Sequence, residues 1–335
     1  MSSTDSKDNH SEVSIDGDAP VPVLFIGGVG RSGSTMVERL LDQIPEVHAI
    51  GETHHLWERG IQDNQLCGCG EPFDSCPTWA QIGKEAFGGW DQIDLDRVIY
   101  LRHAVDRTRR VPELMKPGTL AADVAEYAAI LSNYYRGVQL ATGAELVVDS
   151  AKNLSTAALL RVVPGVDLRI AHVVRDSRGV AYSWTRKVKR PEVDDGSPEA
   201  FMPEYHPAYP AFRWLTDNAG FDVLGKLGTP MVQHRYEDLL GHPAATLREM
   251  LAGTPAAAAD LSFIQGDTAA MAGPVHSVSG NPMRFDTGDL VLRVDDRWSH
   301  ELDDNLRRMV TAITFPLLAK YRYPLRSASP PKVSP

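Results

Sequence analysis

Short runs of apolar residues recur along the chain and have the composition of strands that are buried on both faces. They lie at residues 23–26, 47–50, 146–150, 168–174 and 231–234. Between them, apolar residues recur every three or four positions, which is the spacing of one face of a helix. This alternation predicts a single α/β domain with a central, mostly parallel sheet of about five strands, flanked by helices.

The rest of the chain is less regular. Residues 187–210 are rich in prolines, acids and aromatics, a composition that predicts a lid or binding loop. Residues 253–274 are also expected to form a loop. Helices are expected within 92–141 and at 156–163, 211–226 and 302–321. We expect a domain at 21–325 with insertions at about 53–120 and 187–210, a disordered N-terminal tail at 1–20 and a C-terminal tail at 326–335.

A glycine-rich turn joins the first predicted strand to the first predicted helix. Glycine lets backbone N–H groups curl around an anion, and a helix N-terminus adds positive potential. The spacing matches a Walker A loop except that Ser34 occupies the position of the lysine, and the cation is Arg31 instead. The turn therefore predicts a phosphate-binding loop made of Gly30, Arg31, Ser32, Gly33, Ser34 and Thr35.

The pattern G-x-G-R-S-G-S-T-M-x-x-x-L-L at residues 28–41 resembles the 5′-phosphosulfate-binding loop of PAPS-dependent sulfotransferases, in particular their Golgi-type and bacterial branches. The resemblance implies a three-layer, P-loop-like α/β fold. It also implies binding of 3′-phosphoadenosine 5′-phosphosulfate (PAPS) and transfer of its sulfuryl group to a hydroxyl, or an amine, of an acceptor. The product of the donor would be adenosine 3′,5′-bisphosphate.

A second motif follows the strand at 168–174. Arg175 comes directly after this strand, and Ser183 lies eight residues later in a predicted helix. Sulfotransferases hold the 3′-phosphate of PAPS with an arginine and a serine at this spacing. A guanidinium fork, a hydroxyl and a helix N-terminus suit a dianionic phosphate. The alternative is an N-capping Asp176 followed by surface arginines.

The resemblance also assigns catalytic roles. Glu52 comes directly after the second strand. Its separation in sequence from Arg31 is the interval at which Golgi-type enzymes carry their proposed catalytic base. Lys152, after the third strand, corresponds to a lysine that contacts the sulfuryl group and the leaving oxygen, although the usual N-K-D-P flanks differ here. His54 and His55 are alternative bases, and Glu52 could also be a solvated strand-end residue.

Two later segments also resemble the family. Tyr236, in R-Y-E-D-L, is implied to lie near the nucleotide. The segment at 276–285 is implied to fold over the cofactor, with Arg284 available to phosphate. A basic cluster could meet an anionic acceptor, but a solvated face is the preferred interpretation; it comprises Arg102, His103, Arg107, Arg109 and Arg110.

All three cysteines are clustered, as Cys67, Cys69 and Cys76. They could bind zinc together with a histidine, or form one disulfide and leave one thiol. The spacing is not C-x-x-C and no second pair follows, so a structural loop in the acceptor region is the preferred interpretation.

The net charge of −10 argues against general binding of nucleic acid or acidic membranes. No apolar run approaches the ~18 residues of a membrane span, and the N-terminus lacks the pattern of a signal peptide. We expect a cytoplasmic enzyme whose chemistry requires no metal and whose acceptor is a small molecule, carbohydrate or lipid; a homodimer is compatible with the sequence. A P-loop kinase and a nucleotide-binding protein without transfer activity are the alternatives.

Overall fold

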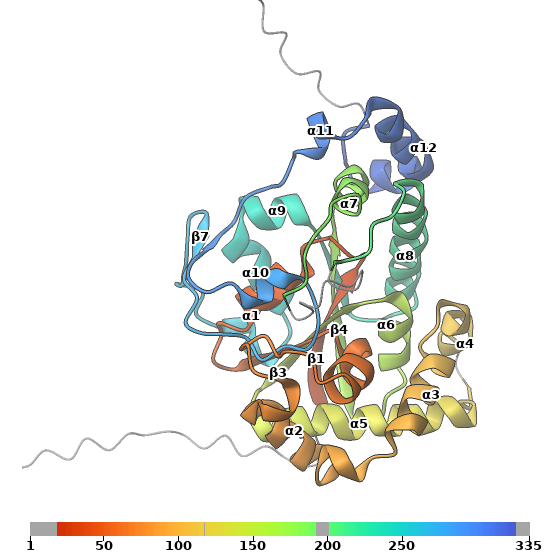
Figure 1. The fold of residues 1–335 in the computed structure, drawn as a ribbon. Helices are drawn as coiled ribbons and strands as arrows, with labels where there is room; N and C mark the ends of the chain where they lie inside the picture. The colour runs from red at the N-terminus through yellow and green to blue at the C-terminus, as the bar shows by residue number, and fades with distance from the viewer. Residues whose placement is uncertain (1–18, 117, 192–200, 326–335) are drawn as a thin grey trace, which may run out of the picture.

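The computed structural model describes residues 19–116, 118–191 and 201–325, so nearly all of the two predicted tails lies outside the described residues. Its centre is a five-stranded sheet in the order β2-β3-β1-β4-β5, with every neighbouring pair parallel (Figure 1). The strands are β1 (Val21–Gly28), β2 (Val47–Gly51), β3 (Leu146–Lys152), β4 (Val166–Val174) and β5 (Met231–Arg235). The predicted fold class and strand number are confirmed.

Helices cover both faces of this sheet, which gives three layers (Figure 1). Alternate residues of β1 point to opposite faces, as the pleat of a strand requires. Val23 and Phe25 pack in a cluster with α5 (Ala122–Thr142), α6 (Leu154–Leu160) and α8 (Ala208–Lys226). Leu24 and Ile26 pack in a second cluster with α1 (Ser34–Leu41), α9 (Tyr236–Gly241) and α10 (Pro243–Leu251).

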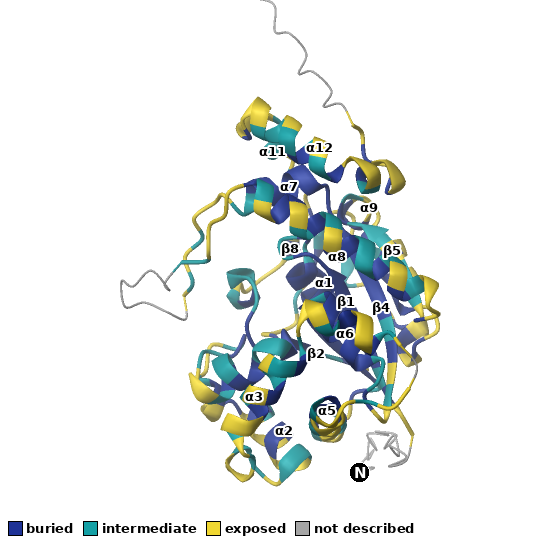
Figure 2. Ribbon diagram, turned by 90° about the vertical axis from the view of Figure 1, so that its right-hand side faces the viewer, coloured by how far each residue is buried: buried dark blue, intermediate teal, exposed yellow. Residues whose placement is uncertain are grey.

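The remaining helices complete the two layers. Residues 77–114 supply three of them, and the other three are a helix that follows β4 and two helices near the C-terminus that pack against it (Figure 2). Their bounds are α2 (Pro77–Phe87), α3 (Leu95–Val105), α4 (Val111–Leu114), α7 (Ser177–Ser183), α11 (Trp298–Glu301) and α12 (Asp304–Lys320). No helix in the described part of the chain is long and apolar enough to cross a bilayer.

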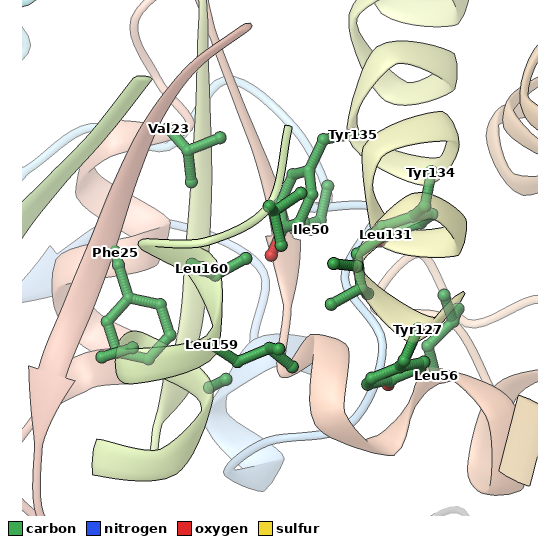
Figure 3. Close-up of a cluster of buried hydrophobic side chains, with 14 of the residues drawn as sticks. Val23, Phe25, Ile50, Leu56, Tyr127, Leu131, Tyr134, Tyr135, Leu159 and Leu160 are labelled. Atoms are coloured by element: carbon green, nitrogen blue, oxygen red, sulfur yellow. The ribbon is translucent and has the colours of Figure 1, made fainter. Parts of the chain in front are cut away.

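The α5 face of the core is rich in aromatic side chains (Figure 3). Val124, Ala128, Leu131 and Tyr135 are all buried, as the helical spacing of the sequence predicts. The hydroxyl of Tyr127 accepts a hydrogen bond from Nε1 of Trp57 at 2.9 Å, because an unsatisfied buried polar group is costly. Tyr135 donates to the buried carboxylate of Asp149 at 2.5 Å, which ties α5 to β3 behind the carboxyl end of the sheet.

Two predicted elements differ from the structure. Residues 253–274 are not simply a loop, because β6 (Ile264–Gln265) and β7 (Thr268–Ala269) pair with β8 (Leu290–Val291) in a small antiparallel sheet. Strands of two residues are too short to show a period-two pattern. Helix α8 begins at Ala208, three residues before its predicted start, and part of the predicted lid, 192–200, lies outside the described residues.

A buried ion pair fixes the start of α7. Arg178 donates to both carboxylate oxygens of Asp176, at 2.8 and 2.6 Å, and Asp176 also caps the helix by accepting from the amide of Arg178. Arg178 donates further to the carbonyl of Pro324 at 2.7 Å and stacks 4.5 Å from the ring of Trp298. Asp176 is therefore an N-cap, as the alternative interpretation of the sequence proposed, but Arg175 and Arg178 are buried and are not the surface arginines that it expected.

Arg178→Met should lower the free energy of unfolding by about 3–5 kcal/mol, because it leaves the carboxylate of Asp176 buried without a counter-charge. Urea denaturation followed by circular dichroism measures this loss. Arg97→Met is the matched control, since Arg97 forms an exposed pair with Glu126 and its replacement should change stability little. Equal stabilities of the Arg178 and Arg97 variants would contradict the structural role.

Candidate active site

A pocket of about 330 Å³ opens at the carboxyl ends of the central strands. Open parallel sheets bind ligands at this edge, because the loops that follow neighbouring strands meet there. Residues after β1, β2 and β3 form its floor, and the segment around Asn281 forms one wall. The three sequence regions that carry the predicted catalytic residues are therefore brought together.

The glycine turn after β1 is shaped by close contacts with two aromatic rings. Gly33 has a positive φ of 91°, and a Cβ there would lie 2.5 Å from the ring of Tyr236, the first residue of α9. A Cβ on Gly30 would lie 2.8 Å from the ring of Trp184. Only glycine fits these positions without displacing a ring. Tyr236 thus lies directly against the turn, and its place near the nucleotide stays a prediction.

Ser34 and Thr35 begin α1 and line the pocket. The first amides of a helix have no intrahelical partner, so these residues present backbone donors as well as hydroxyls to a ligand. Ser32 is buried one residue before the cap; its amide donates to the carbonyl of Val29, and its hydroxyl has no partner within the described structure. The turn therefore offers several unpaired donors around one point.

Arg31 brings a positive charge to the same point. Its backbone is left-handed, with φ 74°, and its guanidinium lies 4.9 Å from the centre of the Trp184 ring. The Nε and one Nη are buried and have no hydrogen-bond partner among the described residues. Burial lowers the pKa of Arg31 because desolvation penalises the charged form. Such a cation favours an anionic ligand in the pocket.

Glu52 and Lys152 form an ion pair inside the pocket. Lys152, at the end of β3, donates from Nζ to Oε1 of Glu52 and to the carbonyl of Ser150 at 3.2 Å. Its backbone has a positive φ of 68°, which is uncommon outside glycine and is found where the surroundings impose a conformation. Because β2 and β3 are neighbours in the sheet, the residues at their ends meet.

The carboxylate of Glu52 is held in its charged form. Burial by itself would raise its pKa, but the charge and hydrogen bond of Lys152 outweigh burial and place the pKa below the ordinary value. His54 and His55 reach 4.0 and 3.8 Å from Oε2 of Glu52. Burial lowers the pKa of His54 to about 3 and that of His55 well below its usual range, so both imidazoles are neutral.

Arg175 and Ser183 do not line this pocket. Arg175 is buried beneath the turn, where its two terminal nitrogens donate to the carbonyls of Arg31 at 3.1 Å and Asp295 at 3.0 Å. Its guanidinium stacks 4.7 Å from the ring of Tyr236, and Ser183 ends α7 in a half-buried position. Arg175 is therefore joined to the pocket through the backbone of the turn.

Comparison with known proteins identifies the family of this chain. A model of the sulfotransferase family matches residues 22–255. The chain belongs to the sulfotransferase family. Among solved structures, this sulfotransferase is similar to the sulfotransferase domain from the Synechococcus PCC 7002 olefin synthase, with 18% identity and a TM-score of 0.45 over 92% of this chain and 97% of that one. No curated protein matches the chain.

The position of Arg284 in this sulfotransferase does not support the expected phosphate contact. Arg284 is only 2% exposed, and it donates to the carbonyls of Ser277 at 2.9 Å and Leu66 at 3.0 Å. It fastens the segment around residue 277 to the insertion after β2 and does not line the pocket. The neighbouring Gly280 and Asn281 reach the pocket instead.

Sequence reasoning missed several pocket residues of this sulfotransferase. Trp184, Tyr205 and Tyr209 form an aromatic wall, and only the aromatic content of 187–210 hinted at it. Arg59 also lines the pocket and donates to the hydroxyl of Ser279 at 2.6 Å. It lies in a seven-residue π-helix, η2 (Leu56–Gln62). The pattern of apolar residues in the sequence did not predict this helix.

The predicted basic cluster at 102–110 lies outside the pocket. Arg102 pairs with Glu58 at 3.1 Å, and Arg110 pairs with Asp123 at 3.0 Å. In these ion pairs, neighbouring carboxylates neutralise the charges of the two arginines. Arg102 and Arg110 are half-buried in these pairs, and only His103, Arg107 and Arg109 form the solvated basic face that was predicted.

Proposed function

We propose that this sulfotransferase transfers the sulfuryl group of PAPS to a hydroxyl of a small-molecule, carbohydrate or lipid acceptor, with an amine as the second acceptor class. The observation that carries this proposal is the convergence of three groups in one pocket. Arg31 has unpaired donors that can bind an anion, and Glu52 is an ionised carboxylate that can accept a proton. Lys152 is a cation paired with Glu52 in the same pocket. Sulfuryl transfer needs this combination of anion binding, base and charge stabilisation.

The donor would bind across the glycine turn. Arg31 suits the 5′-phosphosulfate because its buried Nε and one Nη have no partner among the described residues, and Ser34 and Thr35 add their hydroxyls and the first amides of α1. Arg175 and Ser183 would bind the 3′-phosphate below the turn. Arg175 lies 3.6 Å from a carboxylate oxygen of Asp295, and the phosphate would replace this carboxylate as its anionic partner.

The chemical step assigns one role to each pocket residue. Glu52 accepts the proton of the acceptor hydroxyl as its oxygen forms a bond to sulfur. The bond between sulfur and the bridging oxygen of the 5′-phosphate breaks, and that oxygen keeps the electron pair. Lys152, released from Glu52 as the carboxylate is protonated, stabilises the leaving oxygen, and Arg31 stabilises the sulfonate oxygens. As in phosphoryl transfer, the protein mainly positions the reactants and neutralises charge.

Sulfuryl transfer by this enzyme should not depend on Mg²⁺, because Arg31 and Lys152 supply the positive charge that magnesium supplies in kinases. The rate with labelled PAPS should be the same with and without added Mg²⁺ at constant ionic strength. A rate of sulfuryl transfer that collapses without Mg²⁺ would contradict this assignment of charge. Turnover of ATP without transfer from PAPS would favour the P-loop kinase, although Ser34 occupies the position of the kinase-type lysine in the turn.

Incubation of the purified protein with ³⁵S-labelled PAPS and fractionated cell extracts tests the function. We expect label in one or a few acceptor fractions with the wild-type protein, and ~10²–10⁴-fold slower labelling with the variant Glu52→Gln. Tight binding of adenosine 3′,5′-bisphosphate without transfer to any fraction would favour the second alternative, a nucleotide-binding protein without transfer activity.

A further inference from the structure

A second group of chemically active side chains lies outside the pocket. The sulfurs of Cys67, Cys69 and Cys76 and a ring nitrogen of His276 all lie within 4.8 Å of one another. Cys67 and Cys76 are buried, and Cys69 and His276 are half-buried. The three cysteines come from one short segment, residues 67–76, and His276 lies 200 residues after Cys76. The fold thus gathers every cysteine of the chain around one histidine.

Three of the six distances between these donor atoms lie close to the edges of a zinc tetrahedron, and all six are within 4.8 Å. Zn–S bonds of ~2.3 Å and Zn–N bonds of ~2.0–2.1 Å place two sulfurs ~3.8 Å apart and a sulfur ~3.5 Å from a nitrogen. Cys69 Sγ lies 3.8 Å from Cys76 Sγ, and His276 Nδ1 lies 3.3 Å from Cys76 Sγ and 3.8 Å from Cys67 Sγ. All three cysteines are free, and 3.8 Å is far longer than a disulfide bond of ~2.05 Å.

The backbone around the cluster holds the donors in place. A tight turn presents Cys67 and Cys69 on one side, closed by a hydrogen bond of 2.9 Å from the amide of Gly70 to the carbonyl of Cys67. Between them, the amide of Gly68 donates to the carbonyl of Ser277 at 3.0 Å. A Cβ on Gly68 would lie 2.4 Å from the carbonyl of Val275, so this turn packs directly on the segment that carries His276.

We propose that Cys67, Cys69, Cys76 and His276 bind one Zn²⁺ in a structural site. Three thiolates and one imidazole are a ligand set that zinc prefers, and four protein ligands close the coordination sphere. Such a site has no open position for a substrate, so it is separate from the chemistry of the pocket. This inference goes beyond the proposed function and does not depend on it.

The zinc ion would brace one wall of the pocket. Two residues after His276, Val278 pairs with the end of β2: its carbonyl accepts from the amide of Glu52 at 2.9 Å, and its amide donates to Ile50 at 3.2 Å. Ser279 then accepts from Arg59, and Gly280 approaches the carboxylate of Glu52. The metal would link the insertion after β2 to this segment and so fix the surroundings of Glu52.

The trio of Glu52, His54 and His55 also brings potential ligand atoms together, but it is a poorer metal site. Lys152 already places an ammonium group on the carboxylate of Glu52, and this charge repels a second cation. We therefore assign zinc to the cysteine cluster alone.

Elemental analysis of the full-length protein, purified without an affinity tag that binds metal, tests the proposal. We expect one zinc per chain and no iron. After exchange with Co²⁺, we expect the visible absorption of tetrahedral cobalt and thiolate-to-cobalt charge-transfer bands. A protein that holds no zinc and takes up neither metal at equimolar concentration would overturn the proposal, as would iron in place of zinc or a Cys69–Cys76 disulfide found by mass spectrometry.

Variants add a second readout. Cys76→Ser and His276→Gln should each lower the zinc content to below about a tenth of one equivalent, because a three-ligand remnant holds zinc weakly. His300→Gln, an exposed histidine on α11, is the matched control and should retain one zinc. Full zinc content in both ligand variants would overturn the assignment. If a variant does not fold, the zinc stoichiometry and the cobalt spectrum of the wild-type protein still show whether the site binds metal.

Discussion

Replacing Glu52 by glutamine should lower kcat by ~10²–10⁴-fold while the affinity for adenosine 3′,5′-bisphosphate barely changes. A hydroxyl is a poor nucleophile at neutral pH, and a positioned base removes its proton as the bond to sulfur forms. Glutamine keeps the shape of the side chain and its contact with Lys152 but cannot accept the proton. Initial rates under saturating PAPS measure the loss in kcat, and calorimetry measures the affinity.

The two neighbouring histidines provide the control for Glu52. His54 and His55 lie within 4.0 Å of the carboxylate, and burial keeps both imidazoles neutral. If an imidazole is the base, His54→Ala or His55→Ala will be the inactive variant. If Glu52 is the base, both should retain most activity, and Glu52→Asp should be impaired because its carboxylate is one methylene shorter. A near-normal kcat in Glu52→Gln would show that the base lies elsewhere.

Replacing Arg175 by alanine should weaken the binding of adenosine 3′,5′-bisphosphate by about 2–4 kcal/mol, or about 30–700-fold in Kd. Arg175 is buried beneath the glycine turn, where a charge-assisted bond to a phosphate is strong. The affinity for 5′-AMP, which has no 3′-phosphate, should change little. Isothermal titration calorimetry with both nucleotides measures the difference.

Two comparisons separate recognition of the 3′-phosphate from support of the turn. Arg175 also donates to the carbonyl of Arg31, so its loss could loosen the 5′-binding turn. In that case Arg175→Ala would weaken 5′-AMP and the bisphosphate by the same factor, which would contradict its role at the 3′-phosphate. Arg248→Ala, an exposed arginine on α10, should leave both affinities unchanged.

The sheet and the centre of the pocket could be predicted because their signals are local. The strands are short apolar runs, and the carboxyl ends of parallel strands meet at one edge. This rule places Glu52, which follows β2, near Lys152 at the end of β3 although 100 residues separate them. The turn between β1 and α1 was predictable because glycine spacing reports backbone shape directly.

Other features depend on contacts that leave no local pattern. His276 lies 200 residues after Cys76 in an irregular segment, so nothing in the sequence identified it as the fourth member of the cysteine cluster. The orientation of Arg284 was likewise not predictable, because its partners are main-chain carbonyls of distant residues. Arg59 lies in a seven-residue π-helix, a rare element that is too short to show an apolar period of its own in the sequence.

The central claim is that the donor is PAPS, and titration of the wild-type protein with three nucleotides tests it most directly. Calorimetry with adenosine 3′,5′-bisphosphate, 5′-AMP and ATP needs no knowledge of the acceptor. We predict tight binding of the bisphosphate, displacement of it by PAPS, and much weaker binding of 5′-AMP and ATP. Equal affinities for the bisphosphate and 5′-AMP, or a preference for ATP, would contradict the account.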